Sequence, residues 1–327
     1  MAAPDEVADV TAPPGGFRTA RRLRMMVLVA AAPLLAWIAV SLTASWFWAG
    51  ELASHWTLHA AVLLVPVAIL LRRDRLPGGV VMLAIVLGAL PQFRAAWQAR
   101  APLPGAESRT LTVTHANIYY RNRTVATQLP AVARCTDDLL VLVESGPEDE
   151  ASLRGDPRWP HQQWSYGKPL DDGTISGVAL CSRLPLAGVE LRRDEDLPVI
   201  DARVAQGGRV LRIVVVHPKS PQLPSRQRMR DRGLASIARS VAGSLAPVIV
   251  IGDINCSPAS PAWHRLCAEG SLRPAAGPLP ATWPSWFGPA GIAIDHVLAG
   301  GGAAIGDLRA FPVQGSDHRG ISARIGF

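Results

Sequence analysis

Val248-Ile249-Val250-Ile251-Gly252-Asp253-Ile254-Asn255 is the stretch around which the chain is organised. Its first four residues are apolar and β-branched, a run that is typical of a buried strand. Gly252 ends this run, and the carboxylate of Asp253 and the amide of Asn255 follow in the loop. Open α/β sheets place their chemistry at such strand ends, where a rigid backbone holds side chains against a crevice. The stretch therefore indicates a catalytic loop, with an ordinary Asx turn as the alternative.

The composition indicates a membrane portion in front of a second domain. Hydrophobic residues make up 49% of the 327 residues, and their excess is concentrated in residues 1–100. The net charge is +7, but residues 1–100 hold nine Arg and five acidic residues, which leaves 24 basic and 21 acidic residues afterwards. The later part therefore lacks the cationic excess of a dedicated duplex-DNA binder.

Three apolar runs predict three transmembrane helices within residues 25–93. The runs are Met25–Trp48, Leu52–Leu71 and Leu76–Phe93, and each is close to the roughly 20 residues that cross a bilayer. Residues 1–24 are expected to form a disordered basic N-terminus, and residues 94–108 a linker. A cleaved signal peptide is the alternative for the first run, but two more hydrophobic runs follow it.

The arginines predict how these helices are oriented. The cluster between Arg18 and Arg24 and the loop from Arg72 to Arg75 would both be cytoplasmic by the positive-inside rule. An odd number of spans then places residues 109–327 outside the cytoplasm. His55 and His59 lie at helical spacing, but without a third ligand they are better explained as interfacial histidines than as a metal site.

Residues 109–327 alternate strand patterns with few helices, which predicts an α/β sandwich of two packed mixed β-sheets flanked by helices. The expected strands are Thr110–Ile118, Leu139–Val143, Trp164–Tyr166, Gly177–Ser182, Val199–Val204, Val210–Val216, Ile292–Leu298 and Ile321–Ile325. The expected helices are Thr124–Cys135, Arg226–Val241 and Ser260–Leu266. A hairpin is expected around Gln206-Gly207-Gly208.

Polar side chains stand at or near the ends of these strands. In chain order they are Asn117, Glu144, His217, Asp253, Asn255, Asp295, His296, Ser316, Asp317 and His318. A carboxylate directly after a buried strand, such as Glu144, is costly to bury unless it is paired or bound to a cation. We therefore favour metal ligation over a solvated strand end for Glu144.

This ordered set resembles the endonuclease/exonuclease/phosphatase superfamily, the fold of pancreatic deoxyribonuclease and neutral sphingomyelinases, over about residues 108–327. Gly177–Pro185, Thr282–Pro284 and Ile294–Leu298 further resemble the bacterial YafD-like branch, which has N-terminal membrane helices. The resemblance implies a four-layer α/β sandwich after three transmembrane helices. It also implies an integral protein of the bacterial inner membrane whose catalytic domain is extracytoplasmic.

The resemblance assigns roles around the expected metal. Glu144 would bind Mg²⁺ or Mn²⁺, with Asp317 as a second ligand and Asn117 in support, since hard oxygen ligands suit these ions. Asp253 would orient or deprotonate the attacking water, and Asn255 would hold a phosphate oxygen. Val143 departs from the family, because many relatives carry Gln before the metal-binding Glu.

Further roles concern the phosphate. His318 would contact the scissile phosphate, and Asp295 would pair with His318, fixing its tautomer and favouring its cationic form. His217 would bind the phosphate or protonate the leaving oxygen. Arg226 is a further substrate-binding candidate, with a solvated helix start as the alternative. His115 and His296 are expected to serve the structure, and the stretch Ser145–Pro160 gives no indication of the substrate.

Four cysteines lie in the expected outer domain, where oxidation is possible. A disulfide between Cys256 and Cys267 would tie the catalytic loop to the following helix, and we state it as a hypothesis. Cys135 and Cys181 are equally well explained as small buried apolar residues.

The expected function is that of a membrane-anchored, divalent-metal-dependent phosphodiesterase. Its partners would be membrane lipids and a phosphate ester, either a phospholipid or a nucleic acid, and no protein partner is expected. The alternatives are a phosphomonoesterase and a catalytically silent scaffold domain at the membrane.

Overall fold

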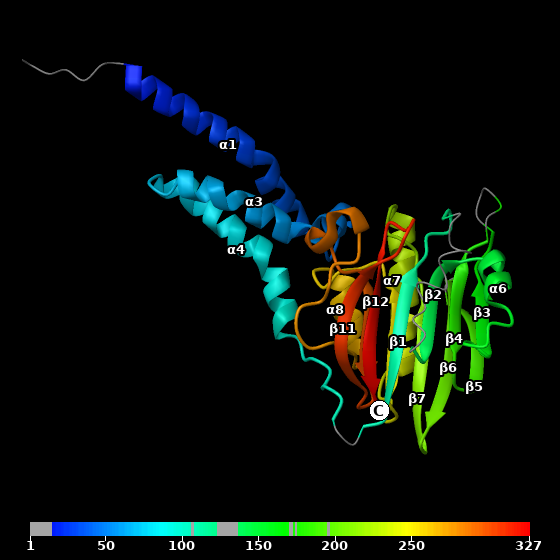
Figure 1. Cartoon of the computed structure of the whole chain (residues 1–327). Coiled ribbons are helices and arrows are strands. Elements are labelled where there is room, and N and C mark those ends of the chain that lie inside the picture. The colour runs from blue at the N-terminus through cyan, green and yellow to red at the C-terminus, as the bar shows by residue number, and fades with distance from the viewer. Residues whose placement is uncertain (1–14, 106–107, 123–136, 170–172, 174, 195–196) are drawn as a thin grey trace, which may run out of the picture.

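A helical portion leads into a domain of two β-sheets in the computed structural model (Figure 1). The structure describes residues 15–105, 108–122, 137–169, 173, 175–194 and 197–327. The expected helix Thr124–Cys135 lies outside the described residues.

Four helices make up the helical portion: α1 (Gly15–Ser41), α2 (Trp48–Ser54), α3 (Thr57–Leu70) and α4 (Arg75–Trp97). Buried apolar side chains such as Ile38, Leu64 and Val81 hold α1, α3 and α4 together. Among the described residues, two helical stretches are long and apolar enough to cross a membrane, Arg21–Ser41 and Arg75–Trp97. These two helices are compatible with anchoring in a membrane.

The expectations for this portion are corrected at two points. α1 begins at Gly15, so the cluster from Arg18 to Arg24 is helical rather than disordered, in keeping with the high helix propensity of Arg and Ala. The single helix expected over Leu52–Leu71 is instead two helices, because α2 and α3 meet at a bend of 66°. The bent pair gives a third span only if the two helices count as one.

Within the described residues, the strands form two six-stranded sheets, as expected of the sandwich. The first sheet has the order β11-β12-β1-β2-β4-β3, with β11 (Ala304–Pro312), β12 (Arg319–Gly326), β1 (Thr110–Asn117), β2 (Leu139–Ser145), β4 (Gly177–Ser182) and β3 (His161–Tyr166). The second has the order β5-β6-β7-β8-β10-β9, with β5 (Leu186–Asp194), β6 (Leu197–Gln206), β7 (Arg209–Val216), β8 (Val248–Asp253), β10 (Asp295–Gly300) and β9 (Arg273–Pro274). Both sheets are mixed, because β1 pairs with β2 and β7 with β8 in parallel.

Strand β8 explains why its sequence is apolar at every position. Ile249 and Ile251 lie in the core between the two sheets. Val248 and Val250 face the opposite way, into a second core with helices α7 (Pro224–Val241) and α8 (Pro261–Glu269). A strand that is buried on both faces shows a continuous apolar run instead of an alternating one.

The elements that were not expected from the sequence include β5, β11 and the helix α6 (Pro147–Leu153). Both strands lie at sheet edges, where charged residues interrupt the apolar pattern. The expected hairpin is confirmed, since Gln206 pairs with Arg209 across the turn. Gly207 and Gly208 have positive φ values of 59° and 79°, a conformation that glycine adopts without strain.

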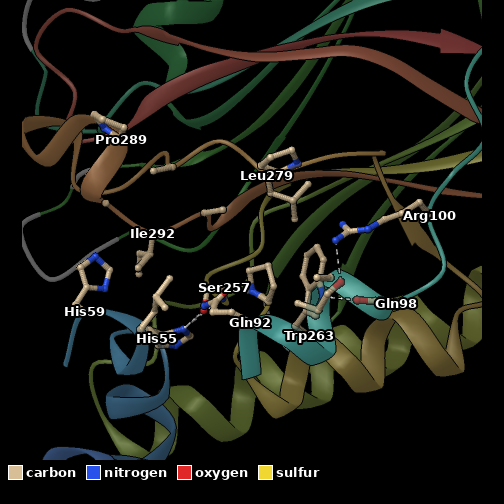
Figure 2. A pocket seen from close by; sticks show the side chains of 18 residues that line it. His55, His59, Gln92, Gln98, Arg100, Ser257, Trp263, Leu279, Pro289 and Ile292 are labelled. Carbon is tan, nitrogen blue, oxygen red and sulfur yellow. Dashed lines mark hydrogen bonds between the residues drawn. The ribbon is translucent and has the colours of Figure 1, made fainter. Parts of the chain in front are cut away.

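The helical portion joins the domain next to the end of the sheets at which β1, β2 and β8 finish (Figure 1). Helix α2 lies there beside the 3₁₀ helix η1 (Ser285–Ala290). A cavity of about 280 Å³ lies between α3, α4 and the domain (Figure 2). Gln98 closes one side of it, where its side chain accepts a hydrogen bond of 3.0 Å from Trp263 Nε1.

Candidate active site

Asn117 at the end of β1 joins the two sheets through its side chain. Its amide nitrogen Nδ2 donates to Glu144 Oε1 at 3.0 Å and to Asp253 Oδ2 at 3.1 Å. Its Oδ1 accepts a hydrogen bond from the backbone of Tyr119. Because the nitrogen faces both carboxylates, Asn117 orients them, a different arrangement from an amide oxygen that ligates a metal itself.

The backbone around these groups adopts unusual conformations. Glu144 and Asn255 have φ values of 57° and 53°, which are uncommon for residues other than glycine and cluster at functional sites. Gly252 has a φ of 149°, and a Cβ there would overlap the carbonyl oxygen of Val216. The glycine of the opening motif is therefore required where β8 passes closest to β7.

Glu144 lies among donors. Its Oε1 is 3.5 Å from His217 Nε2, and its Oε2 accepts a hydrogen bond of 3.2 Å from the backbone of Tyr120. Burial by itself would raise the pKa of Glu144, but the hydrogen bond and charge of His217, with the bonds from Asn117 and Tyr120, lower this pKa to about 2. Glu144 is therefore an anion at neutral pH.

Asp253 lies between two imidazoles. Its Oδ2 is 3.7 Å from His217 Nδ1 and 3.7 Å from His318 Nε2, and its Oδ1 accepts a hydrogen bond of 2.9 Å from the backbone of Asn255. Burial and the charge of Asp295 raise the pKa of Asp253 even though both imidazoles oppose this. The same surroundings raise the pKa of His217, where Glu144 and Asp253 outweigh burial.

Asp295 at the start of β10 binds a histidine with each oxygen. Oδ2 is 2.8 Å from His318 Nδ1, and Oδ1 is 2.9 Å from His115 Nε2. Although burial favours its neutral form, the charges and hydrogen bonds of His318 and His115 hold the pKa of Asp295 well below its usual range. Burial would lower the pKa of His318, but Asp295 and Asp253 raise it to about 10. His318 is therefore cationic at neutral pH.

Among the residues that the structure describes, two groups of side chains have the spacing of a metal site. Glu144, His217 and Asp253 form one, and Asp253, Asp295 and His318 form the other, each with ligand atoms within 4.8 Å of one another. Carboxylate oxygens are the ligands that both Mg²⁺ and Mn²⁺ prefer. Glu144 and Asp253 of the first group therefore fit either ion. In the second group, Asp295 and His318 already bind each other at 2.8 Å.

The structure does not bring two of the predicted residues into these groups. Asp317 accepts a hydrogen bond of 3.0 Å from Trp283 Nε1, and its charge contributes to the raised pKa of His318. Arg226 is exposed, and its guanidinium donates to Gln222 at 3.2 Å.

Asn255 lies at the site, but its side chain is engaged, because Nδ2 donates to the carbonyl of Pro218 at 3.0 Å. His296 contacts the carbonyl oxygen of Cys256 at 3.0 Å, which agrees with a structural role. Ser316 Oγ donates to the carbonyl of Asn117 and accepts from the backbone of His318, so it connects the last loop to β1.

The expected disulfide is wrong. In the described part of the chain, Cys181, Cys256 and Cys267 are free thiols. Cys256 and Cys267 are both buried in the core between the second sheet and helices α7 and α8. Burial raises the pKa of the Cys267 thiol to about 12, so these residues behave as small apolar side chains.

Some contacts of the site carried no signal in the sequence. Tyr120 binds Glu144 through its backbone, which any residue type provides. Trp283 stands in a motif noted above, but the Trp–Pro–Ser context does not reveal that its indole holds Asp317. The pairing of Asp295 with His115 joins residues that are 180 positions apart, and its pairing with His318 joins residues that are 23 positions apart.

The fold and the site together are those of metal-dependent phosphoesterases built on two packed β-sheets. The chain belongs to the endonuclease/exonuclease/phosphatase family, whose model matches residues 114–318. Members of this family hydrolyse phosphate esters with the help of divalent metals. A comparison with curated protein sequences finds no match.

Solved structures show the same fold at low sequence identity. An endonuclease/exonuclease/phosphatase protein from Beutenbergia cavernae is 18% identical with a TM-score of 0.54, over 67% of this chain and 72% of that one. Truncated TDP2 from Caenorhabditis elegans is 16% identical with a TM-score of 0.52, over 67% and 98%. Sphingomyelinase C from Streptomyces griseocarneus is 18% identical with a TM-score of 0.50, over 67% and 99%.

Proposed function

We propose that the chain is a membrane-anchored, divalent-metal-dependent phosphodiesterase. The observation that carries this proposal is that five side chains meet at the strand ends of both sheets, with contacts of 3.0 to 3.7 Å between them: Asn117, Glu144, His217, Asp253 and His318. Glu144, with Asp253 beside it, would hold Mg²⁺ or Mn²⁺, and the ion when bound would neutralise charge on the phosphate. Apart from this ion and water, the chain itself supplies every group that the mechanism needs.

The side chains divide the proton transfers between them. Asp253 would orient the attacking water through Oδ2 and accept its proton as the water oxygen bonds to phosphorus. The raised pKa of Asp253 makes it a stronger base than an ordinary Asp. His217, whose pKa is also raised, would give a proton to the ester oxygen as the P–O bond breaks.

His318 stabilises charge in this scheme. Its cationic ring would contact a non-bridging phosphate oxygen through Nε2, because Nδ1 is held by Asp295. Asp295 is in turn held by His115, so the imidazole keeps one orientation throughout the reaction. Such fixed charges stabilise a transition state without reorganising during the reaction.

A lipid phosphodiester fits the surroundings of the site better than a nucleic acid. Exposed aromatic side chains lie on the segments next to residues that contact the site loops: Trp286 on η1 is 69% exposed, and Trp46, two residues before Trp48, is 85% exposed. Aromatic residues at such positions are typical of the membrane–water interface. The small charge excess of residues 101–327 also favours a lipid headgroup over a polyanion. We further propose that this domain faces the outside of the cytoplasmic membrane, as the arginine distribution predicts.

The test uses the full chain in detergent micelles or nanodiscs. Turnover of bis-p-nitrophenyl phosphate, p-nitrophenyl phosphate, phospholipid and DNA is measured with Mg²⁺, with Mn²⁺ and with EDTA. We expect metal-dependent cleavage of diesters, with phospholipid above DNA. Faster cleavage of the monoester would identify a phosphomonoesterase. If every substrate resists cleavage and no metal raises the melting temperature, the silent scaffold is the correct function.

A further inference from the structure

One short segment of the helical portion, residues 48–59, contacts three loops at the site edge. Trp48 Nε1 donates to the carbonyl of Pro221 at 2.7 Å, in the loop that follows His217. Trp56 lies against Phe287 of η1, with 5.9 Å between ring centroids. The helical portion is thus built into the surroundings of the site.

The third contact reaches the loop that follows β8. His55 Nδ1 lies 2.8 Å from Ser257 Oγ, and Figure 2 shows the two side chains pointing toward each other. Ser260 Oγ donates to Glu51 Oε1 at 2.7 Å. Both serines come directly after the Asp253–Asn255 stretch, so α2 lies against the loop that carries the proposed base.

A buried ion pair crosses the same junction. Arg230 Nη2 of helix α7 lies 2.9 Å from Glu51 Oε1 of helix α2, and the two side chains are 0% and 1% exposed. Burial alone would lower the pKa of Arg230, but the charges of Glu51 and Asp231 raise it. A charge that is buried this deeply requires its partner, because an unpaired one is strongly destabilising.

Arg230 links Glu51 to the active-site loop. Its Nη1 donates to the carbonyl oxygen of Asn255 at 3.0 Å. Asp231 binds Nε and Nη2 of the same guanidinium at 3.0 and 2.7 Å. The planar group is therefore held by two carboxylates, which aims its remaining nitrogen at the loop. The backbone nitrogen of Asn255 in turn donates a hydrogen bond of 2.9 Å to Asp253 Oδ1.

We propose that Glu51 is a positioning residue for the active site. Through Arg230 it fixes the left-handed backbone of Asn255 and with it the carboxylate of Asp253. The helical portion is then a working part of the catalytic site as well as an anchor. This inference rests on the proposed function, since it concerns how the residues of that same site are held in position.

The test compares three variants of the full chain with the wild type in detergent micelles. Glu51→Gln removes the charge, and Glu51→Asp keeps it on a shorter side chain. Asp201→Asn is the matched control, because Asp201 is 3% exposed and pairs with Arg212 at 2.6 Å, away from the loop. Steady-state cleavage of bis-p-nitrophenyl phosphate gives kcat and KM, and thermal melting gives the folded fraction. Hydrogen exchange of a peptide covering residues 248–257 reports the loop without substrate or metal.

We expect Glu51→Gln to lower kcat by about tenfold to a hundredfold with little change in KM, since small displacements of a catalytic group have effects of this size. Exchange in the 248–257 peptide should rise, and Glu51→Asp should restore part of both properties. Asp201→Asn should melt at a lower temperature while its kcat and this peptide stay as in the wild type. If Glu51→Gln keeps wild-type kcat and wild-type exchange, the inference is wrong.

A second variant covers failure of Glu51→Gln to fold. Glu51→Gln combined with Arg230→Met removes both buried charges, which avoids an unpaired one. It also removes the donor to the Asn255 carbonyl, so kcat should remain low and exchange high. Wild-type values in this variant overturn the inference. A wild-type chain without any turnover would instead refute the proposed function, while the exchange experiment would still decide whether Glu51 orders the loop.

Discussion

His318 and Asp295 make the stability of the protein depend on pH. The pKa of His318 is raised to about 10 in the folded chain, above the roughly 6.5 of an unfolded histidine. The contribution of His318 to stability is therefore complete below pH 6.5 and is lost as the pH rises through 10. We expect His318 to contribute a fall in the free energy of unfolding without metal over this window, of at most about 1.4 kcal/mol per pH unit for its one proton.

The measurement is denaturation of the full chain in EDTA at several pH values, together with His318→Asn. The pKa of His217 is raised too, and above about pH 8.5 the raised pKa of the buried Cys267 thiol acts in the same direction, so a weaker slope of the same sign should remain in the variant. Asp295 does not affect the slope in this window, because its lowered pKa changes the free energy of unfolding only at acidic pH. An equal slope in wild type and variant would contradict the cationic state assigned to His318.

Single replacements at the centre of the site should separate catalysis from folding. Asp253→Asn keeps the shape of the side chain but removes the proposed base. We expect kcat to fall by about 10²- to 10⁴-fold, the usual contribution of a positioned acid or base. His318→Asn should lose a similar factor. Asp307→Asn is the control, since Asp307 forms an exposed ion pair with Arg324. Near-normal rates in either site variant would contradict the assigned roles.

The sequence predicted residues of the site better than their contacts. Asp253 and Asn255 were visible because polar side chains directly after an apolar run mark a strand end. The direction of the Asn117 amide and the bond between Trp283 and Asp317 depend on how distant strands meet, which no local pattern records. The disulfide failed for the same reason, because a shared core buries Cys256 and Cys267 without joining them.

At the scale of single elements, the end of β8 is expected to be intolerant of substitution. A Cβ at Gly252 would overlap the carbonyl oxygen of Val216 on the neighbouring strand. We expect Gly252→Ala to destabilise the protein by more than about 1 kcal/mol and to lower kcat, since β7 and β8 must separate beside the base.

The control for this variant is Gly105→Ala, where the nearest atom to an added Cβ is Ser108 Oγ at 3.8 Å. Its effect on the free energy of unfolding should stay within about 0.5 kcal/mol. Both values come from denaturation curves under the same conditions. Equal stabilities of the two variants would show that β8 can move away from β7.

The elements that could be predicted are those whose residues all lie in one kind of environment or carry a turn signal such as paired glycines. β8 is apolar throughout because both faces are buried, and the β6–β7 hairpin is marked by its glycines. β5 and β11 were missed because edge strands carry charges on the exposed side. The break between α2 and α3 was missed for a different reason: hydropathy counts residues 52–71 as one run, whereas the buried polar contacts of Glu51 and His55 hold α2 against the domain.

For the whole molecule, the decisive issue is whether the domain of two β-sheets is independent of the helices that precede it. A chain that begins at Gln98 lacks Glu51, so Arg230 keeps only one of these two carboxylate partners, Asp231. It also uncovers the surfaces that Trp48 and His55 contact. We expect this truncated chain to unfold at a lower temperature than the full chain and to lose at least about tenfold in kcat. Adding Arg230→Met to the truncated chain should recover part of the melting temperature, because the positive charge that Glu51 no longer balances is removed. It should recover none of the turnover, because the Asn255 carbonyl still lacks its donor. Melting curves and kcat of the three chains are sufficient to check this, and a truncated chain that matches the full one in both properties would show that the helical portion serves only as an anchor.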